Sequence, residues 1–138
     1  MGRKKSYNVD MKSQQIHKSH NKTLLLYHMV FSAIYRRKVF DSAVHDTLKE
    51  VRLEISEIYE INFVEIRNNE DHVHFLIQSV PTLSVTKIVT TIKSITARET
   101  FKNNPEVKKL LCGGSLWSSC FYVNTVGQYA NEGMIINM

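Results

Sequence analysis

Residues 71–81 read DHVHFLIQSVP, and this stretch has the alternation of a β-strand with two chemically different faces. Successive side chains of a strand point to opposite sides, so one side of this strand is apolar and carries Val73, Phe75 and Ile77. His72 and His74 lie on the opposite side, two residues apart with Val73 between them. The apolar side predicts packing against a core, while two imidazoles on one face are suitably spaced to bind a single divalent ion.

The metal site rests on a short motif, and a simpler interpretation stands beside it. A His-x-His pair occurs by chance in many chains, and two histidines on a strand are most often half-exposed polar residues. Glu65 and Asp71 lie near the pair in the sequence. Either carboxylate could orient an imidazole, although supporting the turn before the strand is the more ordinary role for Asp71. The rest of the chain must decide between these alternatives.

Composition predicts one compact domain with an anionic partner. The chain has 138 residues, of which 43% are hydrophobic and 22% charged, enough to bury a core. Its 18 basic residues exceed its 13 acidic residues, and the net charge of +5 favours nucleic acid as a partner. Two cysteines, Cys112 and Cys120, are too few for a zinc cluster and are expected to be reduced. Without a membrane-length apolar run or a signal peptide, we expect a cytoplasmic protein with no membrane contact and no organic cofactor.

The first 22 residues differ in composition from the rest. They are basic and have little apolar pattern, with a single acidic residue, Asp10, against Arg3, Lys4, Lys5, Lys12, Lys18 and Lys22. This composition predicts a flexible basic arm over residues 1–22, followed by one folded domain over residues 23–138. The arm either contacts phosphates or only aids solubility.

Hydrophobic periodicity predicts the order of the elements. Residues 23–32 read as a strand, and residues 61–68 and 72–79 as a hairpin joined by a polar turn. A helix beginning after Asp41 or Ser42 has a buried stripe of Val44, Leu48, Val51, Ile55 and Ile58. A second helix from Ser84 has a buried side made of Val85, Ile88, Val89, Ile92 and Ile95, and residues 121–127 form a last strand.

This order, β-α-β-β-α-β, is that of the ferredoxin-like α+β fold. It predicts a four-stranded antiparallel sheet of RRM-like topology, with both helices on one face and the other face open. His72 and His74 would then lie on the open face of a central strand. An RNA-recognition domain of the same topology is less favoured, because such domains stack bases on strand aromatics where this chain has histidines.

Five basic residues are candidate contacts to a nucleic-acid backbone. Arg36, Arg37 and Lys38 follow the first strand. Lys87 and Arg98 lie on the second helix, in a basic and polar row that also contains Thr91, Ser94 and Lys102. Each group has an alternative, since the first could be a solvated turn that protects the strand edge and the second a solvated helix face.

Four segments, in this order, resemble one protein family: YHMVFSAIYRRKVF (27–40), EDHVHFLIQSVP (70–81), IVTTIKSITAR (88–98) and FYVNTVG (121–127). They are similar to the TnpA-type transposases of the smallest bacterial insertion sequences, which are single-tyrosine HUH endonucleases. The resemblance implies a homodimer that recognises hairpins in single-stranded DNA. It also implies that His72 and His74 hold a Mg²⁺ or Mn²⁺ ion while a tyrosine attacks the scissile phosphate and forms a 5′-phosphotyrosine.

The end of the chain departs from this family. In the family, a C-terminal helix after the TVG strand supplies the nucleophilic tyrosine and a glutamine that is the third metal ligand. That tyrosine would fall at Asn137 or Met138, and Tyr129 is the fallback candidate. Together with the unusual Ile34, Cys112 and Cys120, this predicts a truncated C-terminal helix and a decayed copy. The chain is then either an enzyme completed in trans by an intact copy or a catalytically inactive hairpin-binding remnant.

Overall fold

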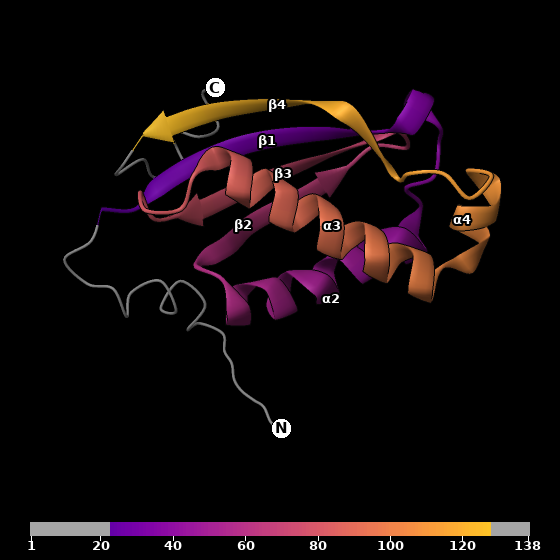
Figure 1. Cartoon of the computed structure of the whole chain (residues 1–138), viewed down its shortest axis with the longest axis horizontal. Coiled ribbons are helices and arrows are strands. Elements are labelled where there is room, and N and C mark those ends of the chain that lie inside the picture. The colour runs from indigo at the N-terminus through magenta and orange to yellow at the C-terminus, as the bar shows by residue number, and fades with distance from the viewer. Residues whose placement is uncertain (1–22, 128–138) are drawn as a thin grey trace.

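The computed structural model describes residues 23–127 and contains one antiparallel sheet covered by helices on one face (Figure 1). The predicted basic arm, residues 1–22, and the segment after Gly127 lie outside the described residues. The strands are β1 (Leu25–Ala33), β2 (Ile61–Asn68), β3 (His72–Ser79) and β4 (Trp117–Gly127). Their order across the sheet is β2-β3-β1-β4, with every neighbouring pair antiparallel. This order confirms the predicted ferredoxin-like α+β topology.

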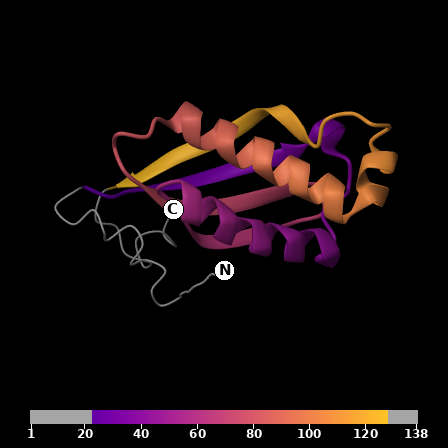
Figure 2. The same cartoon turned by 60° about the horizontal axis from the view of Figure 1, so that its bottom comes forward.

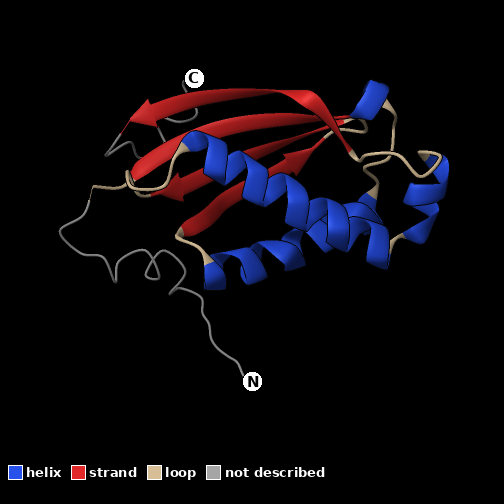
Figure 3. Cartoon of the chain, in the orientation of Figure 1, coloured by secondary structure: helices blue, strands red, loops and turns tan. Residues whose placement is uncertain are grey.

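The two long helices lie side by side on the same face of the sheet (Figure 2). They are α2 (Ser42–Ile58) and α3 (Val85–Asn103). Two shorter helical segments are present as well: η1 (Ile34–Arg36) directly follows β1, and α4 (Pro105–Leu110) follows α3 (Figure 3). No helix within residues 23–127 is both long enough and apolar enough to cross a membrane.

The apolar side of β3 forms part of the core. Val73, Phe75 and Ile77 are fully buried against the helices, and the strand has the predicted bounds. Its neighbour β2 also has the predicted bounds. On β1, Met29 and Phe31 are fully buried on the same side of the sheet. His72 and His74 alternate with these buried residues and so lie on the other face of the sheet. Figure 2 shows both long helices on the first face.

Helix α2 confirms the predicted start and corrects one predicted core residue. Its N-cap is Asp41, whose Oδ1 accepts a hydrogen bond from the backbone N–H of Val44 at 2.9 Å. The predicted stripe is buried from Val44 to Ile55. Ile58, however, is 64% exposed, because the helix ends there and the chain turns into β2.

Helix α3 begins at its predicted cap, Ser84, whose Oγ accepts a hydrogen bond from the backbone N–H of Lys87. The predicted polar row along this helix is interrupted, since Thr91 is buried. Thr96 is buried too, and its Oγ1 accepts a hydrogen bond from the indole Nε1 of Trp117 at 3.0 Å. The hydroxyl of Thr96 also donates to the carbonyl of Ile92 at 2.6 Å, so this threonine, which reads as polar in the sequence, is satisfied inside the fold.

Two elements after α3 were not predicted in this form. The break at Asn104-Pro105 begins α4, in which Pro105 occupies the first turn. Asn104 is buried and its Nδ2 donates to Thr47 Oγ1 at 2.9 Å, which attaches this junction to α2. Strand β4 begins at Trp117, four residues before the predicted start.

Candidate metal centre on the open face of the sheet

The two predicted metal ligands lie together on the open face. His72 and His74 lie two residues apart on β3, and their ring centroids are 5.0 Å apart. Both side chains are half-buried. Strand β3 is hydrogen-bonded on both sides, by β1 and by β2, so the backbone that carries the pair is fixed. The alternation in the sequence therefore gave the correct face and the correct spacing.

His72 is held by the residue that precedes it. Its Nδ1 lies 2.8 Å from Asp71 Oδ1, and the other carboxylate oxygen of Asp71 accepts a hydrogen bond from Arg36 Nε at 3.2 Å. The hydrogen bond from His72, and then that from Arg36, hold the pKa of Asp71 below its usual value, so the carboxylate stays ionised. Of the two roles open for Asp71, orienting an imidazole is the one that this geometry supports.

His74 is held by a third histidine on the neighbouring strand. Its Nδ1 lies 3.2 Å from His28 Nε2, and the two ring planes differ by 20°. Burial is the main reason that the pKa of His74 is lowered, and the nearby His72 and His28 lower it further. A lowered pKa keeps this imidazole neutral, which is the form that binds metal ions.

The donor chemistry fits a divalent ion, although the described residues provide only part of a coordination shell. Each histidine has its Nδ1 engaged by a neighbour, which leaves Nε2 as the nitrogen for an ion. Nε2 of His72 is 3.0 Å from the amide nitrogen of Asn69, a contact that an ion would replace. Within residues 23–127, no three or more His, Cys, Asp or Glu side chains are arranged to hold a metal. The pair would therefore form only half of a metal site and would need further ligands.

Other side chains surround the pair on the open face. The register places Arg67 of β2 and Val30 of β1 on either side of His74, and Tyr122 of β4 beyond Val30. Tyr122 is 54% exposed, and its ring contacts that of His28 edge-on at a centroid distance of 6.3 Å. An exposed tyrosine and an arginine next to the histidines suit contact with a base and a phosphate.

Three of the predicted nucleic-acid contacts lie at one end of the sheet. Arg36 is joined to His72 through Asp71. Arg37 donates from Nη2 to the carbonyl of Leu110 at 2.9 Å, and Lys38 pairs with Glu70 at 3.7 Å. Arg36 has a φ of 55°, which is uncommon for a residue other than glycine and typical of functional segments.

The other two predicted contacts lie elsewhere. Lys87 is exposed on the first turn of α3, on the helical side of the sheet. Arg98 lies further along α3, where it pairs with Glu54 of α2 at 3.4 Å and with Glu99 at 3.1 Å. The structure thus separates the five basic residues into two groups, of which only the first is connected to the histidines.

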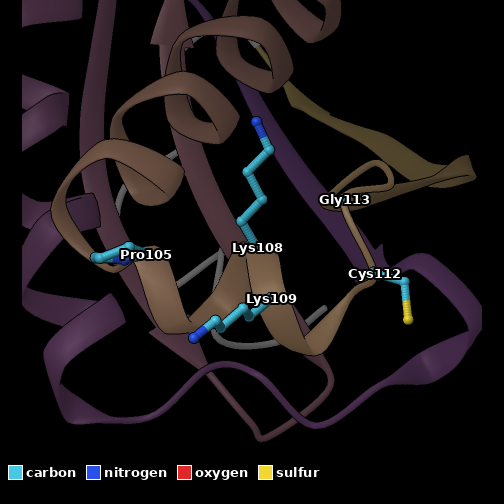
Figure 4. Close-up of a pocket in the computed structure, with 5 residues that line it drawn as sticks. All are labelled: Pro105, Lys108, Lys109, Cys112 and Gly113. Atoms are coloured by element: carbon cyan, nitrogen blue, oxygen red, sulfur yellow. The ribbon is translucent and has the colours of Figure 1, made fainter.

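A shallow basic depression beside α4 is separate from the histidine pair. It is lined by Pro105, Lys108, Lys109, Cys112 and Gly113. Figure 4 shows the two lysine side chains extending from α4 in different directions, so their amino groups do not converge on one point. Cys112 and Cys120 are exposed free cysteines.

Sequence reasoning missed His28, and it named one residue that the structure does not describe. His28 belongs to the segment 27–40 and lies on the open side of β1. Its contact with His74, 46 residues further along the chain, depends on the register between β1 and β3. Alternation predicts faces and not register. Tyr129, and the positions Asn137 and Met138 where the family tyrosine would fall, lie beyond Gly127 and outside the described residues.

Comparison with known proteins finds sequence similarity to one protein family. A family model described as "Transposase IS200 like" matches residues 21–137. The ISDra2 transposase TnpA of Deinococcus radiodurans is 30% identical over 104 residues, covering 75% of this chain and 74% of that protein. A transposase for insertion sequence element IS200 from Salmonella typhimurium is 24% identical over 110 residues, covering 80% of this chain and 72% of that protein.

Two solved structures share the fold. A putative transposase from Deinococcus radiodurans has a TM-score of 0.67 and 23% identity, and the match covers 99% of this chain and 92% of that one. A REP-associated tyrosine transposase bound to a REP hairpin has a TM-score of 0.55 and 9% identity, covering 99% of this chain and 67% of that one.

Proposed function

This chain belongs to the IS200-like transposase family, and from that premise we propose that it acts on single-stranded DNA during transposition of a small insertion sequence. It binds a hairpin in the DNA and takes part in cutting and rejoining the strand beside that hairpin. The observation that carries the proposal is the His72–His74 pair on the open face, with Nδ1 of each ring held by a neighbouring side chain. Since its substrate is DNA, we place the protein in the cytoplasm.

His72 and His74 would hold the ion that this chemistry needs. A bound Mg²⁺ or Mn²⁺ ion would supply positive charge to the oxygens of the scissile phosphate. Asp71 and His28 contact Nδ1 of the two imidazoles, and an ion at Nε2 of His72 would take the place of the contact with Asn69. Two nitrogen ligands favour Mn²⁺ over Mg²⁺, because Mg²⁺ prefers oxygen ligands and retains its waters.

Basic side chains bring the DNA to the histidines. Arg36, Arg37 and Lys38 form a basic segment at the end of the sheet where His72 lies, and Arg67 flanks His74. Lys87 and Arg98 remain candidate contacts on the helical face, although Arg98 is already paired with two glutamates. Contacts of this kind neutralise phosphates and make binding dependent on salt.

The covalent step needs a tyrosine. Its phenolate oxygen attacks phosphorus, the bond from phosphorus to the 3′ oxygen breaks, and that oxygen leaves as a 3′-hydroxyl after taking a proton. Rejoining reverses these steps, so no ATP is consumed. Tyr129 is the candidate nucleophile within this chain, and a tyrosine supplied in trans by an intact copy in a mixed dimer is the alternative. In either case the tyrosine must approach a phosphate bound at His72 and His74.

A second function, hairpin binding without cleavage, is favoured by one observation. The described residues provide two metal ligands and no third His, Cys, Asp or Glu ligand. A domain of this kind would keep the basic surface and bind hairpin DNA in a salt-dependent way, and no covalent adduct would form.

A denaturing gel distinguishes the two functions. The purified chain is incubated with Mn²⁺ and with labelled single-stranded DNA that contains the hairpin and flank of its own element. The proposed activity predicts a protein–DNA adduct that survives denaturation, requires the metal, and disappears in the H72A/H74A double variant. Loss of the adduct in Tyr129→Phe would assign the nucleophile.

The same assay is repeated with an intact family member whose own histidines have been replaced. An adduct that forms only in this mixture shows that the tyrosine comes from the other subunit. Retained binding with no adduct under either condition would leave hairpin binding as the function and overturn the proposed cleavage.

A further inference from the structure

We propose that His28 is the positioning residue for His74. Its Nε2 accepts a hydrogen bond from the Nδ1–H of His74 and so fixes the ring in the tautomer whose Nε2 is free to bind the ion. The inference rests on the proposed function, because it assigns a role toward the metal half-site. It adds a residue from β1 to a site that otherwise lies on β3.

The geometry between the two rings supports a hydrogen bond. His28 Nε2 and His74 Nδ1 are 3.2 Å apart, and the ring planes differ by 20°. A nitrogen–nitrogen contact at this distance requires one N–H and one lone pair, since two N–H groups or two lone pairs would repel each other. One of the two rings therefore donates and the other accepts.

The half-site decides which ring donates. A neutral imidazole carries a single N–H, and the nitrogen without it is the one that binds a metal ion. If His74 donates from Nδ1, its Nε2 has the free lone pair. The opposite arrangement would put the proton of His74 on Nε2 and would prevent that nitrogen from binding an ion. Binding through Nε2 thus requires His28 to be the acceptor.

His72 has the same arrangement with a different partner. Its Nδ1 lies 2.8 Å from Asp71 Oδ1, a carboxylate oxygen that accepts and never donates when ionised. Both histidines of the pair therefore have Nδ1 directed at a fixed neighbour, Asp71 for one and His28 for the other. Metal-binding histidines in general have such a partner on the nitrogen that faces away from the ion.

The position of His28 is itself well fixed, so that it can orient the side chain of His74. Its strand, β1, pairs with β3 on one side and with β4 on the other, and the register aligns His28 with Leu76 and Asn124. The imidazole of His28 is contacted edge-on by the ring of Tyr122. The position of His28 is thus fixed by both the sheet and an adjacent aromatic ring.

The first test measures the tautomer of His74 without any metal. The full chain is labelled with ¹⁵N, and long-range proton–nitrogen spectra are recorded at a pH above the pKa of His74. These spectra report which ring nitrogen carries the proton. We expect the Nδ1–H form in the wild type and in H28Q, whose amide oxygen can accept. We expect the Nε2–H form to appear in H28F, which cannot accept a hydrogen bond. Nε2–H in the wild type, or an unchanged tautomer in H28F, would overturn the proposal.

The second test measures Mn²⁺ binding by calorimetry and by electron spin-echo spectroscopy, which counts bound imidazoles. H28F should bind Mn²⁺ about 10–100-fold more weakly, the effect typical of removing a partner of a metal-binding histidine. H28Q should recover most of the affinity, and L26I, a change on the same face of β1 but opposite Gln78, should bind like the wild type. Two imidazoles per ion are expected. Three would make His28 a direct ligand and contradict the proposal.

The two tests separate this inference from the proposed function. If the wild type binds no Mn²⁺, the proposed metal half-site fails, while the tautomer measurement still decides whether His28 orients His74. If the wild type binds Mn²⁺ and H28F binds it equally well, the half-site stands and the role of His28 is wrong.

Discussion

Asp71 shows how one residue serves both the fold and the site. Its backbone carbonyl accepts a hydrogen bond from the N–H of Ala33, and its side chain holds Arg36 and His72. The sequence placed Asp71 in the turn and left its role open. The sequence alone cannot decide that role, because supporting the turn and orienting His72 both place the carboxylate at the same position. The distance to His72 Nδ1 supplies the missing information.

Replacing Asp71 with alanine tests this role. D71A should weaken Mn²⁺ binding by about 10–100-fold, because His72 loses the partner that orients its ring. Calorimetric titration of the folded variant measures the change. The control is E70A, which removes the neighbouring exposed carboxylate that pairs with Lys38 and does not contact either histidine. Equal losses in both variants would mean that general negative charge, and not the contact with His72, supports the ion.

The candidate ligands were predictable at the residue scale, and their partners were not. His72 and His74 follow from alternation within one strand, which is a local property. His28 becomes a neighbour of His74 only when β1 and β3 pair in one register, and a shift of one residue would place it on the other face. No spacing rule within the chain contains that information.

The junction between α3 and β4 shows what can be predicted of an element. The segment 121–127 reads as a strand, but β4 extends back to Trp117, which is buried beside Phe31 and Phe40. A polar stretch containing Ser118 and Ser119 conceals this extension in the sequence. Helix α4 was missed for a similar reason, because the asparagine and proline that begin it are also typical of loops.

The hydrogen bond across this junction gives a stability prediction. Trp117 Nε1 donates to Thr96 Oγ1 at 3.0 Å, and both groups are buried. T96V keeps the shape of the side chain but leaves the indole N–H without an acceptor, so the free energy of unfolding should fall by about 1–3 kcal/mol. Urea denaturation measures it, with T90V, an exposed threonine of the same helix, as control. A loss no larger than that of T90V would show that the bond contributes nothing.

Lys93 gives a pH prediction at the same junction. Its Nζ donates to the carbonyl of Ser118 at 2.7 Å, and burial lowers its pKa below the ordinary value of 10.5. Between the lowered pKa and 10.5 the unfolded chain binds more protons than the folded chain, so stability rises with pH in that window. Relative to K93M, the free energy of unfolding of the wild type should therefore increase as the pH approaches 10.5. Denaturation series at pH 7 and at alkaline pH test this, and a difference that falls with pH would contradict it.

The whole molecule has two faces with different tasks. Helices α2 and α3 bury the core on one face of the sheet (Figure 2). The register places the histidines, with Arg67 and Tyr122 beside them, on the other face. Topology was predictable because each element has a clear period, and six elements in this order permit few arrangements. The division of basic residues between the two faces was not predictable, since it depends on where each helix lies on the sheet.

This division predicts which charges bind DNA. Replacing Arg37 and Lys38 together with glutamine should weaken binding of hairpin DNA and reduce the salt dependence, by about one unit of slope for each lost phosphate contact. Replacing Lys87 and Arg98 in the same way should have a smaller effect, because both lie on α3, on the helical side of the sheet and away from the histidines. Fluorescence anisotropy at several salt concentrations measures both double variants. A larger loss in the second would move the DNA to the helical face.

Anomalous diffraction at the manganese edge, from crystals of the full chain grown with Mn²⁺, tests the metal half-site most directly. We expect one peak on the open face of the sheet, within coordination distance of one ring nitrogen from each of His72 and His74. In crystals of the H72A/H74A double variant that peak should be absent. A peak bound by neither histidine, or no peak under conditions that saturate the protein, would contradict the central claim that this face holds the metal for DNA cleavage.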